Sequence, residues 1–239
     1  MIHCKDMSYR RVPFVEKEWF HCYTRGVEGR TTFETAGDYS RFMQSLYLCN
    51  SSESIRRDDI KRITPLDLYT HLRRESLVDI GAYCLMPNHF HLLLRSRLEG
   101  GITRFMQKVG TAYTMYFNIK NKRVGSLFIT PFRSKHIPED VYFKRVAQYI
   151  HLNPVELFEP DWKKGLDFVT ARRRLAVTEK RLRDYPYSSL VEYEKIKGLS
   201  KRPERAILDA EAFDFIKEGL PPLTSMLENA ALYYQELSP

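Results

Sequence analysis

The chain has 239 residues, of which 43% are hydrophobic and 28% are charged, and these proportions exclude a disordered or fibrous protein. No apolar run approaches the roughly 18 residues that a membrane helix needs. The opening residues, MIHCKDMSYRR, lack the apolar core of a signal peptide. We therefore expect a cytoplasmic protein with no membrane partner.

The charge is unevenly distributed along the chain. Thirty-eight Lys and Arg residues against thirty Asp and Glu residues give a net charge of +8. Residues 206–239 hold six acidic residues and one basic residue, a net of −5, which leaves +13 for residues 1–205. A basic body of this size favours polyanions, and nucleic acid is the commonest polyanion of the cytosol. The charge therefore predicts a nucleic-acid partner.

The first half of the chain is predicted to alternate between strands and helices. Residues 19–26 form a strand, and Asp38 then caps a helix whose apolar residues follow at i, i+4 and i+7. A short helix is predicted for residues 64–74, with Thr64 as its N-cap. Residues 78–86 and 89–95 are apolar strands, and the Pro87-Asn88 pair between them is typical of a hairpin turn.

Three elements follow the hairpin. Residues 102–120 keep helical spacing, residues 128–137 form an edge strand that tolerates Pro131, and a helix runs from Asp140 until Pro154 ends it. Without the short helix the order is β-α-β-β-α-β-α, which predicts an α+β fold: a ferredoxin-like, mostly antiparallel sheet with helices on one face. We assign residues 1–155 to this core domain. Residues 156–239 are a basic linker and a helical C-terminal extension with an acidic tail.

The tripeptide His89-Phe90-His91 is the sharpest chemical feature. Because strand side chains alternate, His89 and His91 share one face and Phe90 points to the other. Two imidazoles at neighbouring same-face positions can hold a divalent metal. The alternative is two histidines that only hydrogen-bond to their neighbours, because the pair needs a third ligand and a nucleophile to become a reactive site.

The helix that starts at Asp140 offers both missing groups. Tyr149 and Asn153 lie four residues apart along one border of its apolar stripe. A phenol and an amide oxygen can therefore face the same point. The alternative is a boundary tyrosine and an asparagine that merely ends the helix before Pro154.

Three stretches resemble a known family. The stretch from Ala82 to Leu94 is similar to the HUH strand of the REP-associated tyrosine transposases, relatives of the single-tyrosine transposases of small bacterial insertion sequences. Tyr149-Ile150-His151-Leu152-Asn153-Pro154 is similar to their second signature, and residues 20–27 resemble their first strand. The resemblance covers roughly residues 15–155 in order, and returns at residues 185–189.

The resemblance implies both a site and a reaction. It makes His89 and His91 the paired metal ligands, Tyr149 the nucleophile, and Asn153 the third ligand. The family cleaves and rejoins single-stranded DNA hairpins, either repetitive extragenic palindromes or element ends, through a 5′-phosphotyrosine. It uses Mg²⁺ or Mn²⁺ and no nucleotide cofactor. The resemblance further implies an HUH core over residues 1–155 and association with a bacterial nucleoid, and it leaves monomer or homodimer open.

Basic side chains near these motifs could hold DNA phosphates. We name five as DNA-binding candidates: Arg25, Arg104, Lys108, Arg133 and Lys135. The chain departs from the family after Pro154, where Glu156-Leu157-Phe158 replaces the usual Arg-Ala-Gly run, and a basic stretch intervenes before Tyr185.

Other functions stay open at this level. An HUH relaxase or replication initiator would nick DNA without mobilising an element, but such relatives commonly carry three-histidine sites, and no third histidine stands at a suitable spacing. A domesticated, non-catalytic regulator would bind hairpins only. A hydrolase that uses the same metal would turn over without a protein–DNA adduct.

Overall fold

The computed structural model describes residues 13–53, 64, 67–138, 140–160, 162, 172–194 and 202–230. Its centre is a four-stranded sheet of order β2-β3-β1-β4 in which every neighbouring pair is antiparallel. The strands are β1 (Trp19–Arg25), β2 (Val78–Met86), β3 (His89–Ser96) and β4 (Arg133–Ile137). This order confirms the predicted ferredoxin-like, antiparallel α+β core.

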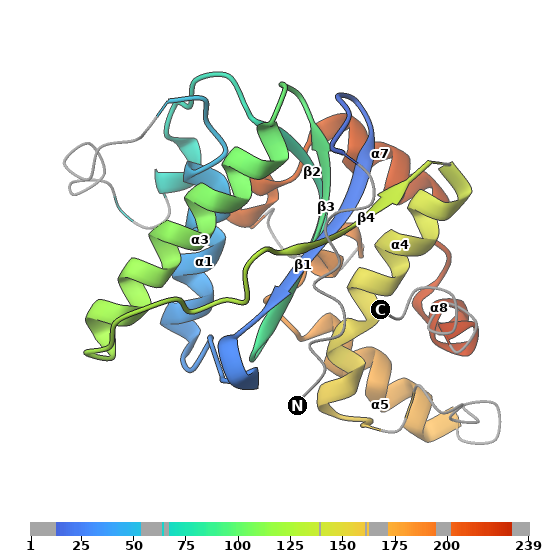
Figure 1. Cartoon of the computed structure of the whole chain (residues 1–239). Coiled ribbons are helices and arrows are strands. Elements are labelled where there is room, and N and C mark those ends of the chain that lie inside the picture. Colours follow the sequence, from blue (N-terminus) through green and yellow to red (C-terminus); the bar gives the residue numbers. More distant parts are fainter. Residues whose placement is uncertain are drawn as a thin grey trace, which may run out of the picture.

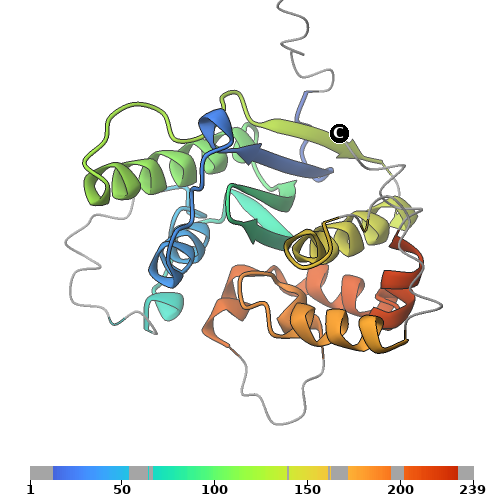
Figure 2. The same cartoon turned by 90° about the horizontal axis from the view of Figure 1, so that it is seen from below.

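Helices cover both faces of the sheet. Helices α1 (Ala36–Leu48) and α3 (Gly101–Lys120) lie on one face, and α4 (Asp140–Leu152) lies on the other (Figure 1). Figure 2 shows the same division from below, with the C-terminal helices α5 (Arg172–Arg183), α7 (Ala210–Gly219) and α8 (Leu223–Glu228) on the side of α4. The prediction of helices on one face is therefore wrong. The physical reason is that β2 is buried at all nine positions, with apolar side chains towards both sides and Asp79 as its one charged residue.

Shorter helical segments connect these elements. They are η1 (Val27–Gly29), η2 (Asp67–Thr70), η3 (Asn153–Leu157), α6 (Leu190–Tyr193) and η5 (Pro203–Ile207). Among the residues that the structure describes, none of the helices is both long enough and apolar enough to span a membrane.

A glycine in β2 allows the extension to pack closely on the sheet. A Cβ added at Gly81 would lie 3.2 Å from the Trp19 ring and 3.3 Å from side-chain carbons of Leu93 and Ile216. Ile216 belongs to α7, so the C-terminal extension reaches the same sheet face as α4. The described part of the extension is thus a packed layer on the core.

Three predicted boundaries shift in the structure. Asp38 is the third residue of α1, and Thr35 is its N-cap, because the two side chains form a reciprocal capping box. In the region of the predicted helix 64–74, the structure describes only the short η2. The edge strand begins at Arg133, after Pro131, since proline has no N–H to give to the strand ladder.

Residues 185–189 run along the free edge of β2. The amide of Leu85 donates to the Tyr187 carbonyl at 2.9 Å, and the amide of Ser189 donates to the Tyr83 carbonyl at 2.9 Å. The Tyr185 hydroxyl donates to the Leu85 carbonyl at 2.6 Å. The segment that again resembles the family therefore docks on the core and covers an open sheet edge.

The Ser189 side chain joins this segment to the end of α4. Its buried Oγ accepts the Tyr83 amide at 2.9 Å and lies 2.9 Å from His151 Nε2. Burial lowers the pKa of His151 to about 3, so the ring is neutral at pH 7. A Ser189→Ala substitution should lower the free energy of unfolding by about 1–3 kcal/mol, because it leaves buried polar groups without a partner. Urea denaturation followed by circular dichroism checks this, with the exposed Ser40→Ala as the control; equal losses in both variants would contradict it.

Candidate active site

The paired histidines lie on the sheet face that α4 covers. His91 stands opposite Tyr23 of β1, and His89 stands opposite Arg25 at the end of the same strand. Side chains of directly paired residues share a face of the sheet. His91 is 5% exposed and His89 is half-buried, so the pair runs from the interior towards the hairpin end of the sheet.

Tyr149 of α4 packs directly over this face. Its ring centroid lies 5.7 Å from that of His91 and 5.6 Å from that of His21, with its plane nearly perpendicular to the His91 ring at 88°. Tyr149 is 3% exposed. The structure thus brings the predicted nucleophile beside a predicted metal ligand of its own chain, with no second copy required for the contact.

Asn153 follows Tyr149 by one helical turn and is 1% exposed. Its amide nitrogen donates to the Tyr149 backbone carbonyl at 2.8 Å, so the amide oxygen is the atom that remains for a cation. The four residues that the sequence singled out are therefore placed on β3, on the end of α4 and on the first residue of η3, which follows α4 directly.

Burial controls the protonation of the site. It raises the pKa of the Tyr149 phenol to about 12, with Tyr23 and Cys84 raising it further and a hydrogen bond with Asn153 opposing them. Burial also lowers the pKa of His21 to about 3, helped by the positive charge of Lys135. At pH 7 Tyr149 is therefore a neutral phenol and His21 a neutral imidazole.

His21 is the site residue that the sequence analysis missed. It is 4% exposed and its Nε2 lies 2.9 Å from His91 Nδ1. Sequence spacing could not identify it, because 70 residues separate the two histidines. The available signal was topological: His21 and Tyr23 alternate onto one face of β1, and β1 pairs with β3.

Both predicted metal ligands have their Nδ1 atoms occupied. His91 Nδ1 faces His21, and His89 Nδ1 lies 2.7 Å from the Asn88 side-chain oxygen. Contacts of this kind to the non-ligating nitrogen are typical of metal-binding histidines. In the described part of the chain no group of three His, Cys, Asp or Glu side chains is arranged to hold a metal ion.

The five DNA-binding candidates divide between the two faces. Arg133 and Lys135 of β4 stand opposite Tyr23 and His21, and Arg25 stands opposite His89, so these three share the face of the site. Arg104 and Lys108 belong to α3 on the other face. They donate to backbone carbonyls of residues 51–53 at distances from 2.6 to 3.2 Å.

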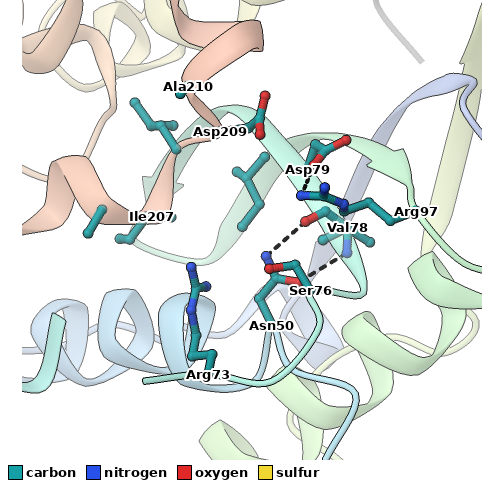
Figure 3. A pocket seen from close by; sticks show the side chains of 12 residues that line it. Asn50, Arg73, Ser76, Val78, Asp79, Arg97, Ile207, Asp209 and Ala210 are labelled. Atoms are coloured by element: carbon teal, nitrogen blue, oxygen red, sulfur yellow. Dashed lines mark hydrogen bonds and ion pairs between the residues drawn. The ribbon is translucent and has the colours of Figure 1, made fainter. Parts of the chain in front are cut away.

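A separate cavity lies at the far end of β2 from the hairpin. It has a volume of about 150 Å³ and is lined by Asn50, Asp79, Arg97 and Asp209 among others (Figure 3). Asn50 bonds to the Val78 backbone, and Arg97 pairs with Asp79 at 3.1 Å. Its lining includes none of the candidate site residues.

Comparisons with known proteins found a family model and a solved structure to which this chain is similar. The family model "Transposase IS200 like" matches residues 43–153. A solved structure described as the REP-associated tyrosine transposase bound to a REP hairpin is similar at 14% identity, over 82% of this chain and 97% of that chain, with a TM-score of 0.48. None of the curated proteins matches. Residues 43–153, which hold His89, His91, Tyr149 and Asn153, are therefore similar to the IS200-like transposases.

Proposed function

We propose that this protein cleaves and rejoins single-stranded DNA at hairpins through a 5′-phosphotyrosine on Tyr149. The observation that carries the proposal is the packing of Tyr149 over His91, with ring centroids 5.7 Å apart within one chain. The match to the IS200-like transposases supports it, and so does the +13 charge of residues 1–205.

The donor set fits a divalent cation. The Nδ1 contacts of His89 and His91 with Asn88 and His21 favour the tautomer whose lone pair is on Nε2, and Asn153 has an amide oxygen as donor. We propose that these three residues hold Mg²⁺ or Mn²⁺. A bound cation would neutralise charge on the scissile phosphate and favour ionisation of a nearby phenol.

The chain supplies the nucleophile in a form that is inert until DNA binds. Tyr149 is a neutral phenol at pH 7, because burial raises its pKa to about 12. In the proposed step its Oη bonds to phosphorus as the bond from phosphorus to the 3′-oxygen breaks, and the proton lost by the phenol balances the one gained by the leaving 3′-hydroxyl. Attack of a 3′-hydroxyl on the phosphotyrosine reverses the step without ATP. Because Tyr149 is 3% exposed, binding of the DNA strand has to uncover its hydroxyl before it can attack.

Basic residues beside the site offer positive charge to the backbone of a single DNA strand. We propose that Arg25, Arg133 and Lys135 contact the DNA backbone, since the sheet register places them on the face of His89 and Tyr23. Single-stranded DNA suits this basic face because its backbone can bend towards the metal and its flanking bases stay unpaired. Arg104 and Lys108 lie on the opposite face.

A covalent-trapping experiment tests the proposal. Wild-type protein is incubated with a labelled single-stranded hairpin oligonucleotide and Mn²⁺, separated on a denaturing gel, digested and examined by mass spectrometry. We expect an adduct whose nucleotide mass maps to the peptide with Tyr149. Tight hairpin binding without any adduct would favour a non-catalytic regulator, and cleavage without an adduct would favour metal-dependent hydrolysis.

Removal of the metal or of one ligand should stop cleavage and spare binding. A His89→Ala variant should cleave at least about 100-fold more slowly, because loss of even an outer-shell partner of a metal typically costs roughly 10- to 100-fold. EDTA should have the same effect on the wild type, and added Mn²⁺ should restore only the wild type. Initial cleavage rates from the gel give the comparison, and an unchanged rate in His89→Ala would remove His89 from the ligand set.

A further inference from the structure

His21 occupies the centre of the site but has no part in the chemistry proposed above. It is 4% exposed, lies under the Tyr149 ring, and stands opposite Leu93 on one side and Lys135 on the other. Burying a polar ring carries a desolvation cost, so a buried histidine normally has a specific hydrogen-bond partner. Here that partner is His91.

The contact between the two imidazoles is a well-formed hydrogen bond. The nitrogen atoms are 2.9 Å apart, the ring centroids are 5.0 Å apart, and the ring planes differ by 25°. This combination places the bond close to the planes of both rings, in the direction of the nitrogen lone pair and the N–H. The contact therefore fixes the rotation of the His91 ring.

The other proposed metal ligand, His89, indicates which ring nitrogen carries the proton. Asn88 Nδ2 donates to the Gly29 carbonyl at 3.2 Å, so the amide oxygen is the atom that faces His89 Nδ1 at 2.7 Å. An amide oxygen only accepts, which puts the His89 proton on Nδ1 and leaves the Nε2 lone pair unprotonated. The contact from His21 reaches the equivalent atom of His91. The same proton placement puts the lone pair of each ring on Nε2, the atom through which a histidine with an engaged Nδ1 binds a metal.

We propose that His21 is a positioning residue, which accepts the Nδ1 proton of His91 and so holds the Nε2 lone pair of His91 towards the cation; this rests on the proposed function. The role is distinct from that of a third ligand. His21 directs its Nε2 at His91, and the described residues include no three-histidine cluster fit for a metal.

Two variants of similar size separate this role from packing. His21→Gln keeps an acceptor oxygen near the position of Nε2, and His21→Phe keeps a buried ring without an acceptor. Titration with Mn²⁺ alone, followed by the electron paramagnetic resonance of the free ion, should give a dissociation constant about 10- to 100-fold higher for His21→Phe. His21→Gln should bind Mn²⁺ close to the wild-type value. Wild-type affinity in His21→Phe, or equal loss in a natively folded His21→Gln, would overturn the proposal.

A second readout needs neither metal nor DNA. In the metal-free wild type, long-range ¹H–¹⁵N spectra should show His91 as the Nδ1–H tautomer, and His21→Phe should shift it towards the Nε2–H form. An Nε2–H tautomer in the wild type would overturn the proposal. A protein that forms no adduct yet binds Mn²⁺ in a His21-dependent manner would contradict the proposed strand transfer alone.

Discussion

A Tyr149→Phe variant should form no covalent adduct with hairpin DNA while it binds that DNA and Mn²⁺ as the wild type does. Phenylalanine fills the same buried space over His91 and His21 but has no oxygen to attack phosphorus. We expect strand cleavage to fall at least about 1,000-fold, because the proposed mechanism has no second path once its nucleophile is gone. The denaturing gel measures the adduct, and a filter-binding assay measures DNA affinity.

Tyr23 provides the matched control for this variant. It is the other phenol of the site, half-buried on β1, with its ring centroid 5.6 Å from that of His91. A Tyr23→Phe variant should still form the adduct, since only Tyr149 is proposed to attack. An adduct that persists in Tyr149→Phe and disappears in Tyr23→Phe would show that Tyr23, and not Tyr149, is the nucleophile.

Local sequence patterns predicted most of the core. Apolar runs on both sides of Pro87-Asn88 predicted the hairpin of β2 and β3, and helical spacing predicted α3 and α4, because these signals depend on neighbours in the chain. The start of α1 was misassigned between Thr35 and Asp38 because both residues of a capping box are typical N-caps. The second helical layer was missed because an apolar strand does not reveal that both of its faces are covered.

Long-range placement limited what could be said of the site. His89, His91, Tyr149 and Asn153 belong to motifs that are short in sequence, whereas His21 joins them only through the register of β1 on β3. For the same reason, the sequence could not distinguish the DNA-binding candidates on the site face from those on the opposite face. Net charge cannot tell that Lys135 shares the site face while Lys108 donates to the carbonyls of Ser51 and Glu53 on the other side of the sheet.

Asp38 should be one of the most sensitive positions for stability, although it lies away from the site. Its carboxylate is fully buried and accepts hydrogen bonds from Lys120 Nζ at 2.7 and 2.8 Å, from the Tyr116 hydroxyl at 2.9 Å, and from the Thr35 amide at 2.9 Å. It thereby links the start of α1 to the end of α3. An Asp38→Ala substitution should lower the free energy of unfolding by about 3 kcal/mol, because it leaves a paired cation and several donors without their acceptor.

The dependence of this loss on pH identifies the charge as its cause. Burial alone would raise the pKa of Asp38, but the hydrogen bonds from Lys120, Tyr116 and Thr35 together lower it below the ordinary 3.8. A carboxylate with a lowered folded-state pKa contributes stability that is fully present above pH 3.8 and is lost as the pH falls through the folded value. Urea denaturation of the wild type and Asp38→Asn should therefore give a large difference in the free energy of unfolding at pH 7 and a smaller one below pH 3.8. A difference that stays constant across this range would show that the shape of the side chain, and not its charge, holds α1 to α3.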